Sequence, residues 1–456
     1  MTSYLQTRSK LRDASAIDAV PRVTSPHATF DLAPFQVLKV PGGYLSSFPW
    51  DTVPAEITGT TYYVDGASGS DSNNGTSVTT PLLNLKTAVA KTDVGIIYIK
   101  AGTFHRTTGS GNGWMFDSSY TWPSRNLALI GWGGTVTIYD GNPGTGSTWV
   151  DAGSGAFTTT LANVQHVLDT SQADPLVSTL PLQLTLRADL AAVQAADEGW
   201  AVSGTTLHVK RDDEVQPGAT TMIIRNAGWP AIKSPVIYMR NIRILGSASG
   251  FRPNSTAYDQ DAKFIAVSCT FAYSLESSDY DALGVTNFGF AGLKSCHGYY
   301  GGKDVFNYHC ASAEVGDNPQ VLEEGCVAKY SAWKRTEKRG PYQASTVHDG
   351  TVVTRINGTY GPSLAGPPIQ EDGDGAFRTT MAWLVGGTCD ATSSPSGTGE
   401  LSAAWDYALL GGTGTETWCD GVTFVAGTVS VKGGTTGPVH LRDGTVPTMT
   451  GTVSPY

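Results

Sequence analysis

Val267-Ser268-Cys269-Thr270 has two counterparts further along the chain, Lys294-Ser295-Cys296-His297 and Glu324-Gly325-Cys326-Val327. Their cysteines are 27 and 30 residues apart. Continuing this interval in both directions, and passing over Cys310, extends the series to Asn241, Cys269, Cys296, Cys326, Asn357, Cys389 and Cys419. Seven positions at a near-constant spacing indicate a structural repeat of about thirty residues.

A repeat of this length, made of short strands and Gly-rich turns, cannot bury its inward face alone and has to stack on its neighbours. Stacked coils lie ~4.8 Å apart, as adjacent strands of a sheet do. Equivalent residues then form ladders along the axis of the stack. The sequence therefore predicts an all-β chain whose C-terminal half is a right-handed parallel β-helix, a solenoid with seven coils between Asn241 and Cys419.

The cysteines have three possible roles. Cysteine is small and often buried, so it suits an interior ladder. A disulfide framework is typical of small secreted domains with little core, and in-register residues on parallel strands point their Cβ atoms alike, which disfavours the bond. A zinc site would need CxxC or HxxxH spacing, and neither occurs. We therefore expect free thiols, no bound metal and no cofactor.

The composition narrows the class of protein. The 456 residues are 40% hydrophobic and 15% charged, with 54 glycines and a net charge of -10. This balance argues against nucleic acid as the main partner. No apolar run reaches eighteen residues, so we expect no membrane insertion. The first residues lack the basic-then-apolar order of a signal peptide, which predicts a protein that is intracellular, released by lysis or carried on a particle, although removal of a signal would leave the same sequence.

Residues 1–58 contain six prolines and show neither a strand nor a helix period, so they are predicted to form an extended arm. The alternatives are a disordered tail and an anchor that becomes ordered against a partner. The arm is rich in aromatic residues: Phe30, Phe35, Tyr44, Phe48 and Trp50. So many aromatic residues favour the anchor.

The next segment begins with Tyr62-Tyr63-Val64-Asp65-Gly66. Thr80 is expected to cap a short helix that has Pro81 at its first position and covers the first coil. A buried strand is predicted within residues 95–104. Four polar residues between the first strand and the helix fit either a calcium site or a polar turn. They are Asp65, Asp71, Asn73 and Asn74.

This opening resembles that of the pectate-lyase-like right-handed β-helix family, which includes polysaccharide lyases, glycoside hydrolases and bacteriophage tailspikes. Residues 198–209 resemble the Trp-containing β insertion of several such proteins. The resemblance implies an arm (1–58), a capping helix with the first coils (59–139), an inserted β subdomain (140–222) and the main β-helix (223–456). It also implies a homotrimer, but neither motif specifies a reaction.

Polar residues between the ladder positions are the candidates for chemistry, since residues one coil apart become neighbours on a solenoid. Glycan cleavage needs two carboxylates or a base beside a uronate carboxylate. The candidate catalytic residues are Asp304, His348, Asp349, Glu371 and Asp372. The candidate glycan-binding residues are Lys303, Tyr308, His309, Trp333, Arg335 and Trp405. Arg355 is a further candidate to neutralise an acidic sugar.

Other interpretations of these residues remain open. Asp-Gly pairs are ordinary turn chemistry, so Asp349 and Asp372 are equally candidates for turn residues. His309 and His348 are also candidates for structural histidines, and the charged run at 334–339 for a solvated loop.

Three functions fit these features of the sequence. The first is a phage or phage-like particle spike that recognises, and is a candidate to depolymerise, bacterial surface polysaccharide, attached through residues 1–58 to tail or capsid proteins. It would lie on the surface of the particle. The second is a secreted, extracellular polysaccharide lyase or glycoside hydrolase. The third is a glycan-binding structural protein without catalysis.

Overall fold

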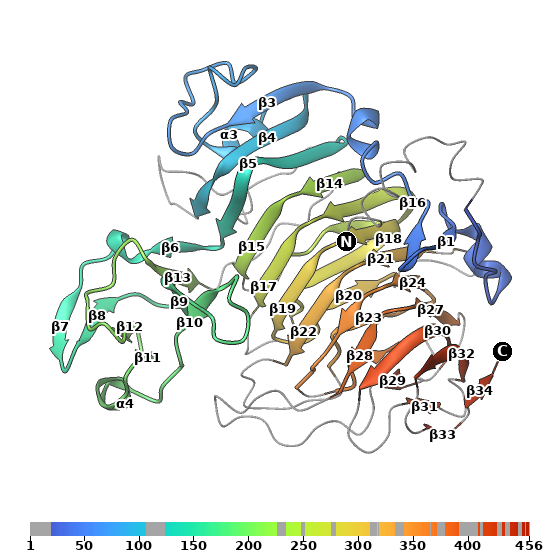
Figure 1. Cartoon of the computed structure of the whole chain (residues 1–456). Coiled ribbons are helices and arrows are strands. Elements are labelled where there is room, and N and C mark those ends of the chain that lie inside the picture. The colour runs from blue at the N-terminus through green and yellow to red at the C-terminus, as the bar shows by residue number, and fades with distance from the viewer. Residues whose placement is uncertain are drawn as a thin grey trace.

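The structure, a computed structural model, describes residues 20–105, 124–225, 234–247, 251–274, 280–310, 317, 319–332, 342–364, 366–371, 379–391, 409–410, 414–425, 431–433, 438–445, 449–451 and 453–455. Nearly all regular elements in this part of the chain are β-strands, and most of them pair in parallel with the strand one coil earlier and one coil later. These pairings form three stacks, which the chain visits in turn (Figure 1).

The first stack is the longest. Its strands are β3 (Thr60–Val64), β4 (Val94–His105), β5 (Leu127–Tyr139), β14 (Val236–Arg240), β16 (Asn254–Val267), β18 (Leu283–Lys294), β21 (Gln320–Glu324), β24 (Val352–Ile356), β27 (Thr380–Val385), β30 (Thr415–Val425), β32 (Val439–Thr445) and β34 (Val453–Pro455). The second stack contains the C-terminal ends of β4, β5 and β30. Its other strands are β15 (Ile242–Ser247), β17 (Thr270–Ser274), β19 (His297–Gly301), β22 (Val327–Ser331), β25 (Thr359–Tyr360) and β28 (Thr388–Asp390).

The third stack begins with the first halves of β16 and β18. It continues with β20 (Phe306–His309), β23 (Ser345–Val347), β26 (Ile369–Gln370), β29 (Leu409–Leu410), β31 (Val431–Gly433) and β33 (Met449–Gly451). Long strands such as β18 and β30 pair in two stacks at once, and they join the stacks into a closed ring. The pairing pattern is that of a parallel β-solenoid, with its core inside the ring.

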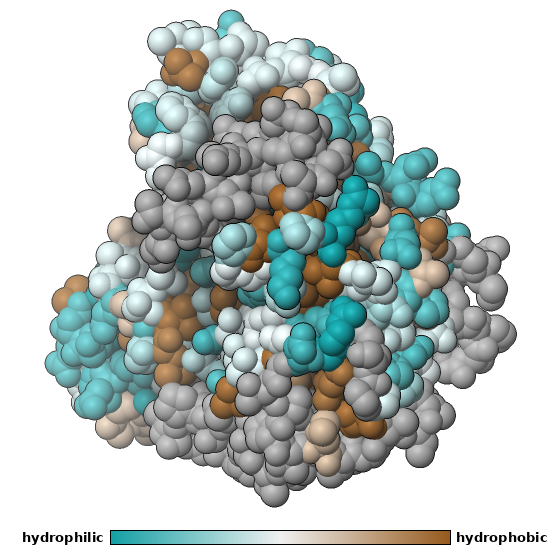
Figure 2. Space-filling model, turned by 45° about the vertical axis from the view of Figure 1, so that its right-hand side comes forward, coloured by the Kyte–Doolittle hydropathy of each residue, from teal (hydrophilic) through white to brown (hydrophobic). Residues whose placement is uncertain are grey.

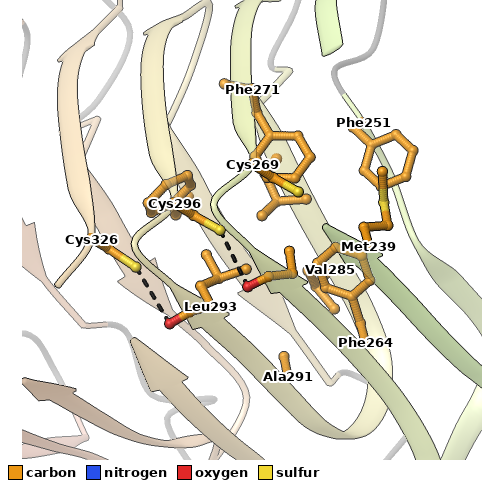
Figure 3. Close-up of a cluster of buried hydrophobic side chains, with 14 of the residues drawn as sticks. Met239, Phe251, Phe264, Cys269, Phe271, Val285, Ala291, Leu293, Cys296 and Cys326 are labelled. Carbon is orange, nitrogen blue, oxygen red and sulfur yellow. Dashed lines mark hydrogen bonds between the residues drawn. The ribbon is translucent and has the colours of Figure 1, made fainter. Parts of the chain in front are cut away.

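The three cysteines of the opening repeat lie one coil apart in this core. Cys269, Cys296 and Cys326 follow one another in a row and point into the same interior (Figure 3). The peptide N–H after each of the last two bonds to the carbonyl of the cysteine one coil earlier, from His297 to Cys269 and from Val327 to Cys296. All six cysteines are free and buried, so the prediction of free thiols is confirmed.

The other four positions of the predicted ladder, Asn241, Asn357, Cys389 and Cys419, are not equivalent to these three cysteines, so that part of the prediction is wrong. Asn241 and Asn357 are left-handed turn residues at the ends of first-stack strands, with φ of 55° and 51°. Ser268 and Ser295, one residue before their cysteines, are their equivalents. Cys389 pairs with Tyr360, which pairs with Ala328, and Cys419 pairs with Leu384. Spacing alone cannot fix register, because the coils differ in length.

A helix covers the first coil, as expected, but it starts later than predicted. α3 (Leu85–Val89) has Asn84, not Thr80, at its N-cap. Leu82 forms a parallel bridge with Val64 instead of entering the helix. Leu85, Ala88 and Val89 pack into the core at this end. Asp65 accepts hydrogen bonds from the Ala67 and Ser68 amides, which is the turn interpretation of that segment.

Two antiparallel four-stranded sheets lie between β5 and β14 and project from the solenoid (Figure 1). One contains β7 (Val150–Gly153), β8 (Ala156–Thr160), β12 (Thr206–Lys210) and β11 (Gly199–Ser203), beside α4 (Leu190–Ala195). The other contains β10 (Pro181–Gln183), β9 (Val164–Ala173), β13 (Thr221–Arg225) and β6 (Gly141–Pro143), with the 3-10 turn η3 (Gly144–Gly146). The division into four domains stays a prediction.

Residues 20–57 run as a strap along the outer side of the first stack. They contain η1 (Ala28–Leu32), β1 (Val37–Val40), β2 (Gly43–Ser46) and η2 (Val53–Glu56). Their contacts reach successively earlier coils as the strap proceeds: the Thr24 carbonyl with Arg442, Phe30 with Trp418 and Trp383, the Tyr44 carbonyl with Asn357, Trp50 with Glu324, and Asp51 with Arg240. The strap thus spans the first stack from β32 back to β14.

The arm was predicted to become ordered against another protein, yet from residue 20 onward it packs on its own solenoid. Residues 1–19 lie outside the described part, so an external partner for them stays a prediction. On the side that carries the strap, hydrophobic side chains form separate patches with hydrophilic ones between them (Figure 2). None of the helices in the described ranges has the length and hydropathy to cross a membrane.

Candidate functional site

A polar group lies where β20 and β23 meet on the third stack. Alternate residues of a strand point to opposite faces. Tyr308 and Val347 point into the core, so His309 and His348 emerge on the outer face, one coil apart. Their rings stack with centroids 4.2 Å apart and planes 9° apart. We call Lys303, His309, His348 and Asp349 the lateral group.

Asp349 completes a hydrogen-bonded pair with His309. Its Oδ2 lies 3.1 Å from His309 Nδ1 and also accepts from the Cys310 amide. Burial opposes ionisation of Asp349, but the hydrogen bond and charge of His309 lower its pKa. Asp349 has φ of 59°, and Gly350 follows it, so this carboxylate is also a turn residue. The turn and the pairing are compatible, because the turn is what aims the side chain back at His309.

His348 is held neutral. Burial, with the nearby positive charges of His309 and Lys303, lowers its pKa to about 3, and Asp349 only partly opposes this. A neutral imidazole can stack on His309 without charge repulsion. Lys303 (24% exposed), His309 (34%) and Asp349 (21%) all keep part of their side chains open to solvent. The lateral group therefore offers one cation and one His–Asp pair to a ligand.

Asp304 lies behind Lys303 and is fully buried, with Lys303 Nζ 3.3 Å from its Oδ2. Burial raises its pKa to about 7, against the charge of Lys303. Asn307 Nδ2 donates to both Asp304 and Asp281, at 2.9 and 3.2 Å. Asp304 cannot touch a polysaccharide from this position, so the catalytic role predicted for it is replaced by that of a buried partner to Lys303.

Asp281 and Asn307 were not predicted, although the sequence contained a signal for the first. Asp281-Ala282-Leu283 and Asp304-Val305-Phe306 share an acidic residue two places before a third-stack strand. Leu283 pairs with Phe306, which places the two carboxyl groups in neighbouring coils. A search for repeats outside the cysteine series would have found this ladder.

Three other predicted site residues, Tyr308, Glu371 and Arg355, are buried in the core, so Arg355 cannot neutralise an acidic sugar. Tyr308 is buried and donates from its hydroxyl to Glu323 Oε1 at 2.8 Å. Glu371 is buried against the guanidinium of Arg355. Neither a sugar ring nor a scissile bond can reach the interior, so the predicted stacking and catalytic roles do not fit. Asp372, Trp333, Arg335 and Trp405 lie outside the described residues, and their roles stay predictions.

The known proteins that this chain is similar to are distant. No protein-family model matches the sequence, and no curated protein does. Among solved structures, XylC in complex with xylose is 10% identical with a TM-score of 0.46, over 84% of this chain and 70% of that one. Pectate lyase Pel9A is 13% identical with a TM-score of 0.34, over 86% and 78%.

A third similar structure is the Gp54 tailspike of Acinetobacter baumannii bacteriophage AP22 with capsular saccharide. It is 12% identical with a TM-score of 0.19, over 79% of this chain and 64% of that one. Likenesses this distant carry no argument about what the chain binds.

Proposed function

We propose that the chain binds an acidic bacterial surface polysaccharide along the outer face of the third stack. The observation that carries the proposal is the lateral group itself, in which Lys303 and the His309–Asp349 pair are open to solvent beside the neutral His348. An ammonium group in a partly buried setting favours a carboxylate ligand. A solenoid face also presents the same strands coil after coil, which suits a polymer.

In this proposal the solenoid is right-handed, the hand of nearly all parallel crossover connections. The chain is the spike of a phage or phage-like particle, a homotrimer attached through the N-terminal end of the arm. The support is the sequence resemblance described above, because the aromatic residues of the arm pack on the chain's own solenoid. Isolation of particles with the chain bound to tail or capsid proteins, and its mass in solution, test this part. A monomer found only free in the medium would favour the secreted lyase or hydrolase instead.

An array of purified acidic and neutral bacterial capsular and lipopolysaccharide glycans tests the binding proposal. We expect acidic glycans to bind, and we expect Lys303→Ala to reduce their affinity at least tenfold. Lys329→Ala is the matched control, because this lysine projects from β22 in the second stack. Equal losses in both variants, or binding of neutral glycans alone, would sink the proposal.

The His309–Asp349 pair favours one reaction, elimination. Asp349 fixes the Nδ1–H of His309, so Nε2 is free to act as the base. That nitrogen would take the proton beside the uronate carboxylate, while Lys303 neutralises the carboxylate. The electron pair of the C–H bond forms a carbon–carbon double bond as the glycosidic C–O bond breaks. Water protonates the leaving oxygen, and His309 returns its proton to the solvent.

Absorbance of unsaturated uronates, read together with reducing ends, separates the outcomes. Elimination gives both signals, hydrolysis gives reducing ends alone, and a pure binder gives neither. We expect His309→Ala and Asp349→Asn to abolish the absorbance. Cleavage that survives His309→Ala and Asp349→Asn would place the reaction elsewhere on the chain.

A further inference from the structure

Charged side chains lie inside the solenoid directly beneath the lateral group. Glu323, Arg355 and Glu371 are each at most 1% exposed. Arg355 Nε lies 3.6 Å from Glu323 Oε2, and its Nη1 donates to Glu371 Oε1. The hydroxyls of Tyr308, Ser345 and Tyr360 all donate to Glu323, at 2.6 to 2.8 Å. We call these six residues the interior cluster.

The fold does not require charge at this place. Parallel register puts Glu323 and Arg355 in one interior ladder. Its other members include Leu129, Met239, Ala266, Leu293, Leu384, Cys419 and Leu441. Ser345 likewise occupies a third-stack slot that holds Leu283, Phe306, Ile369 and Leu409 in other coils. Burying charges costs free energy that an apolar ladder does not incur. Among the ladder residues named here, the only polar ones are Glu323, Arg355 and Ser345, and they lie in the coils that carry the lateral group.

The cluster is bonded to the two strands from which the histidines emerge. Tyr308, which donates to Glu323, immediately precedes His309. The Val347 amide, which immediately precedes His348, donates to Glu371 Oε2 at 2.7 Å. A backbone carbonyl of the next coil would usually accept from such an amide. Here β26 has only two residues, so the side-chain carboxylate of Glu371 accepts this hydrogen bond in place of a backbone carbonyl.

We propose that the interior cluster positions the lateral group, with Glu371 and Glu323 as positioning residues that hold His348 and His309 from the inner side of β23 and β20. The functional sense of this inference rests on the proposed function of the lateral group. The positioning itself does not, because it concerns only the two strands and the side chains on each face.

Glu371→Gln tests the inference with little change in volume. The carboxylate accepts from both Arg355 and Val347, whereas the amide has a single acceptor oxygen, so one of the two contacts is lost. We expect the end of β23 to loosen and His348 to gain solvent. Its pKa should then rise from about 3 by one unit or more. The readout is NMR titration of the eight labelled histidines, assigned with His309→Gln and His348→Gln.

Leu384→Ala is the matched control, since it leaves a cavity in the same ladder one coil further on. We expect this variant to lose stability as well, while its His309 and His348 signals stay at their wild-type positions. Unmoved histidine signals in Glu371→Gln, or an equal shift in Leu384→Ala, would overturn the inference. Because no glycan enters this measurement, failure of the proposed function gives a different pattern: moved histidines on a chain that binds no polysaccharide.

Discussion

Trp50 Nε1 lies 3.3 Å from Oε2 of Glu324, a residue 274 positions further along the chain. The same carboxylate accepts from the Ser46 amide and hydroxyl. Lys294 completes the contact, with Nζ 3.2 Å from Glu324 Oε1 and 5.3 Å from the centre of the Trp50 ring. The strap is therefore fixed to the middle of the solenoid by a buried indole and a buried charge.

Trp50→Ala should release the strap. The substitution removes a buried aromatic side chain, a loss that typically costs about 3–5 kcal/mol. We expect a lower melting temperature and rapid tryptic cleavage after Lys39, which lies in β1 of the strap. Leu32→Ala is the control, because Leu32 is also in the strap but 64% exposed. If Trp50→Ala were as resistant to trypsin as Leu32→Ala, the strap would be held by its other contacts.

Asp304 and His348 should have opposite effects on stability as pH changes. The pKa of Asp304 rises from an ordinary value near 4 to about 7 on folding, so its folded form holds a proton that the unfolded form loses. The contribution of Asp304 to the free energy of unfolding therefore falls as pH rises from 4 to 7. The pKa of His348 falls to about 3, so its contribution rises with pH from 3 to 6.5. Between pH 4 and 6.5 the two slopes cancel.

Single variants should uncover each slope. Asp304→Asn leaves His348, so stability should increase from pH 4 to 6.5 more steeply than in the wild type. His348→Gln leaves Asp304, so stability should decrease over the same range. Each slope is at most about 1.4 kcal/mol per pH unit. Melting temperatures measured at half-unit intervals check both, and parallel curves for the three proteins would contradict the assignment.

The inserted sheets should be held to the solenoid partly by one buried hydrogen bond. Tyr273, Tyr300 and Tyr330 stack one coil apart, and the Tyr300 hydroxyl donates to Asp174 Oδ1 at 2.5 Å. Tyr300→Phe should cost about 1.5–3 kcal/mol, the usual contribution of a hydrogen bond to a charged group. Tyr299→Phe is the control, because that hydroxyl has a weak 3.4 Å contact with His297. Equal melting temperatures for the two variants would show that the bond to Asp174 contributes nothing.

The repeat itself was predictable from sequence because Cys269, Cys296 and Cys326 fall in coils of nearly equal length. The register of the remaining positions was not. Left-handed turn residues end the first-stack strands at 241, 268, 295, 325, 357, 386 and 421, so the interval varies from 27 to 35 residues. Asparagine tolerates that conformation, which is why Asn241 and Asn357 mimic a cysteine position one residue away.

The candidate site was likewise predictable only in part from the sequence. Coil spacing predicted that His309, His348 and Asp349 converge on one lateral face, and the structure brings them together. Which face a residue occupies was harder to predict, since a shift of one residue exchanges inside for outside. Glu371 and Tyr308 are polar and follow the expected spacing, yet they point inward, because Arg355 and Glu323 provide buried partners that no local pattern shows.

The six cysteines should be unreactive in the folded chain. All are buried, and burial raises the pKa of the Cys296 and Cys326 thiols well above their usual value. The thiolate is the reactive form, so both access and ionisation oppose alkylation. We expect a thiol reagent to modify essentially none of them under native conditions and all six after denaturation without a reductant. Fewer than six reactive thiols in the denatured chain would reveal disulfides, and fast native labelling would show that the interior ladder opens.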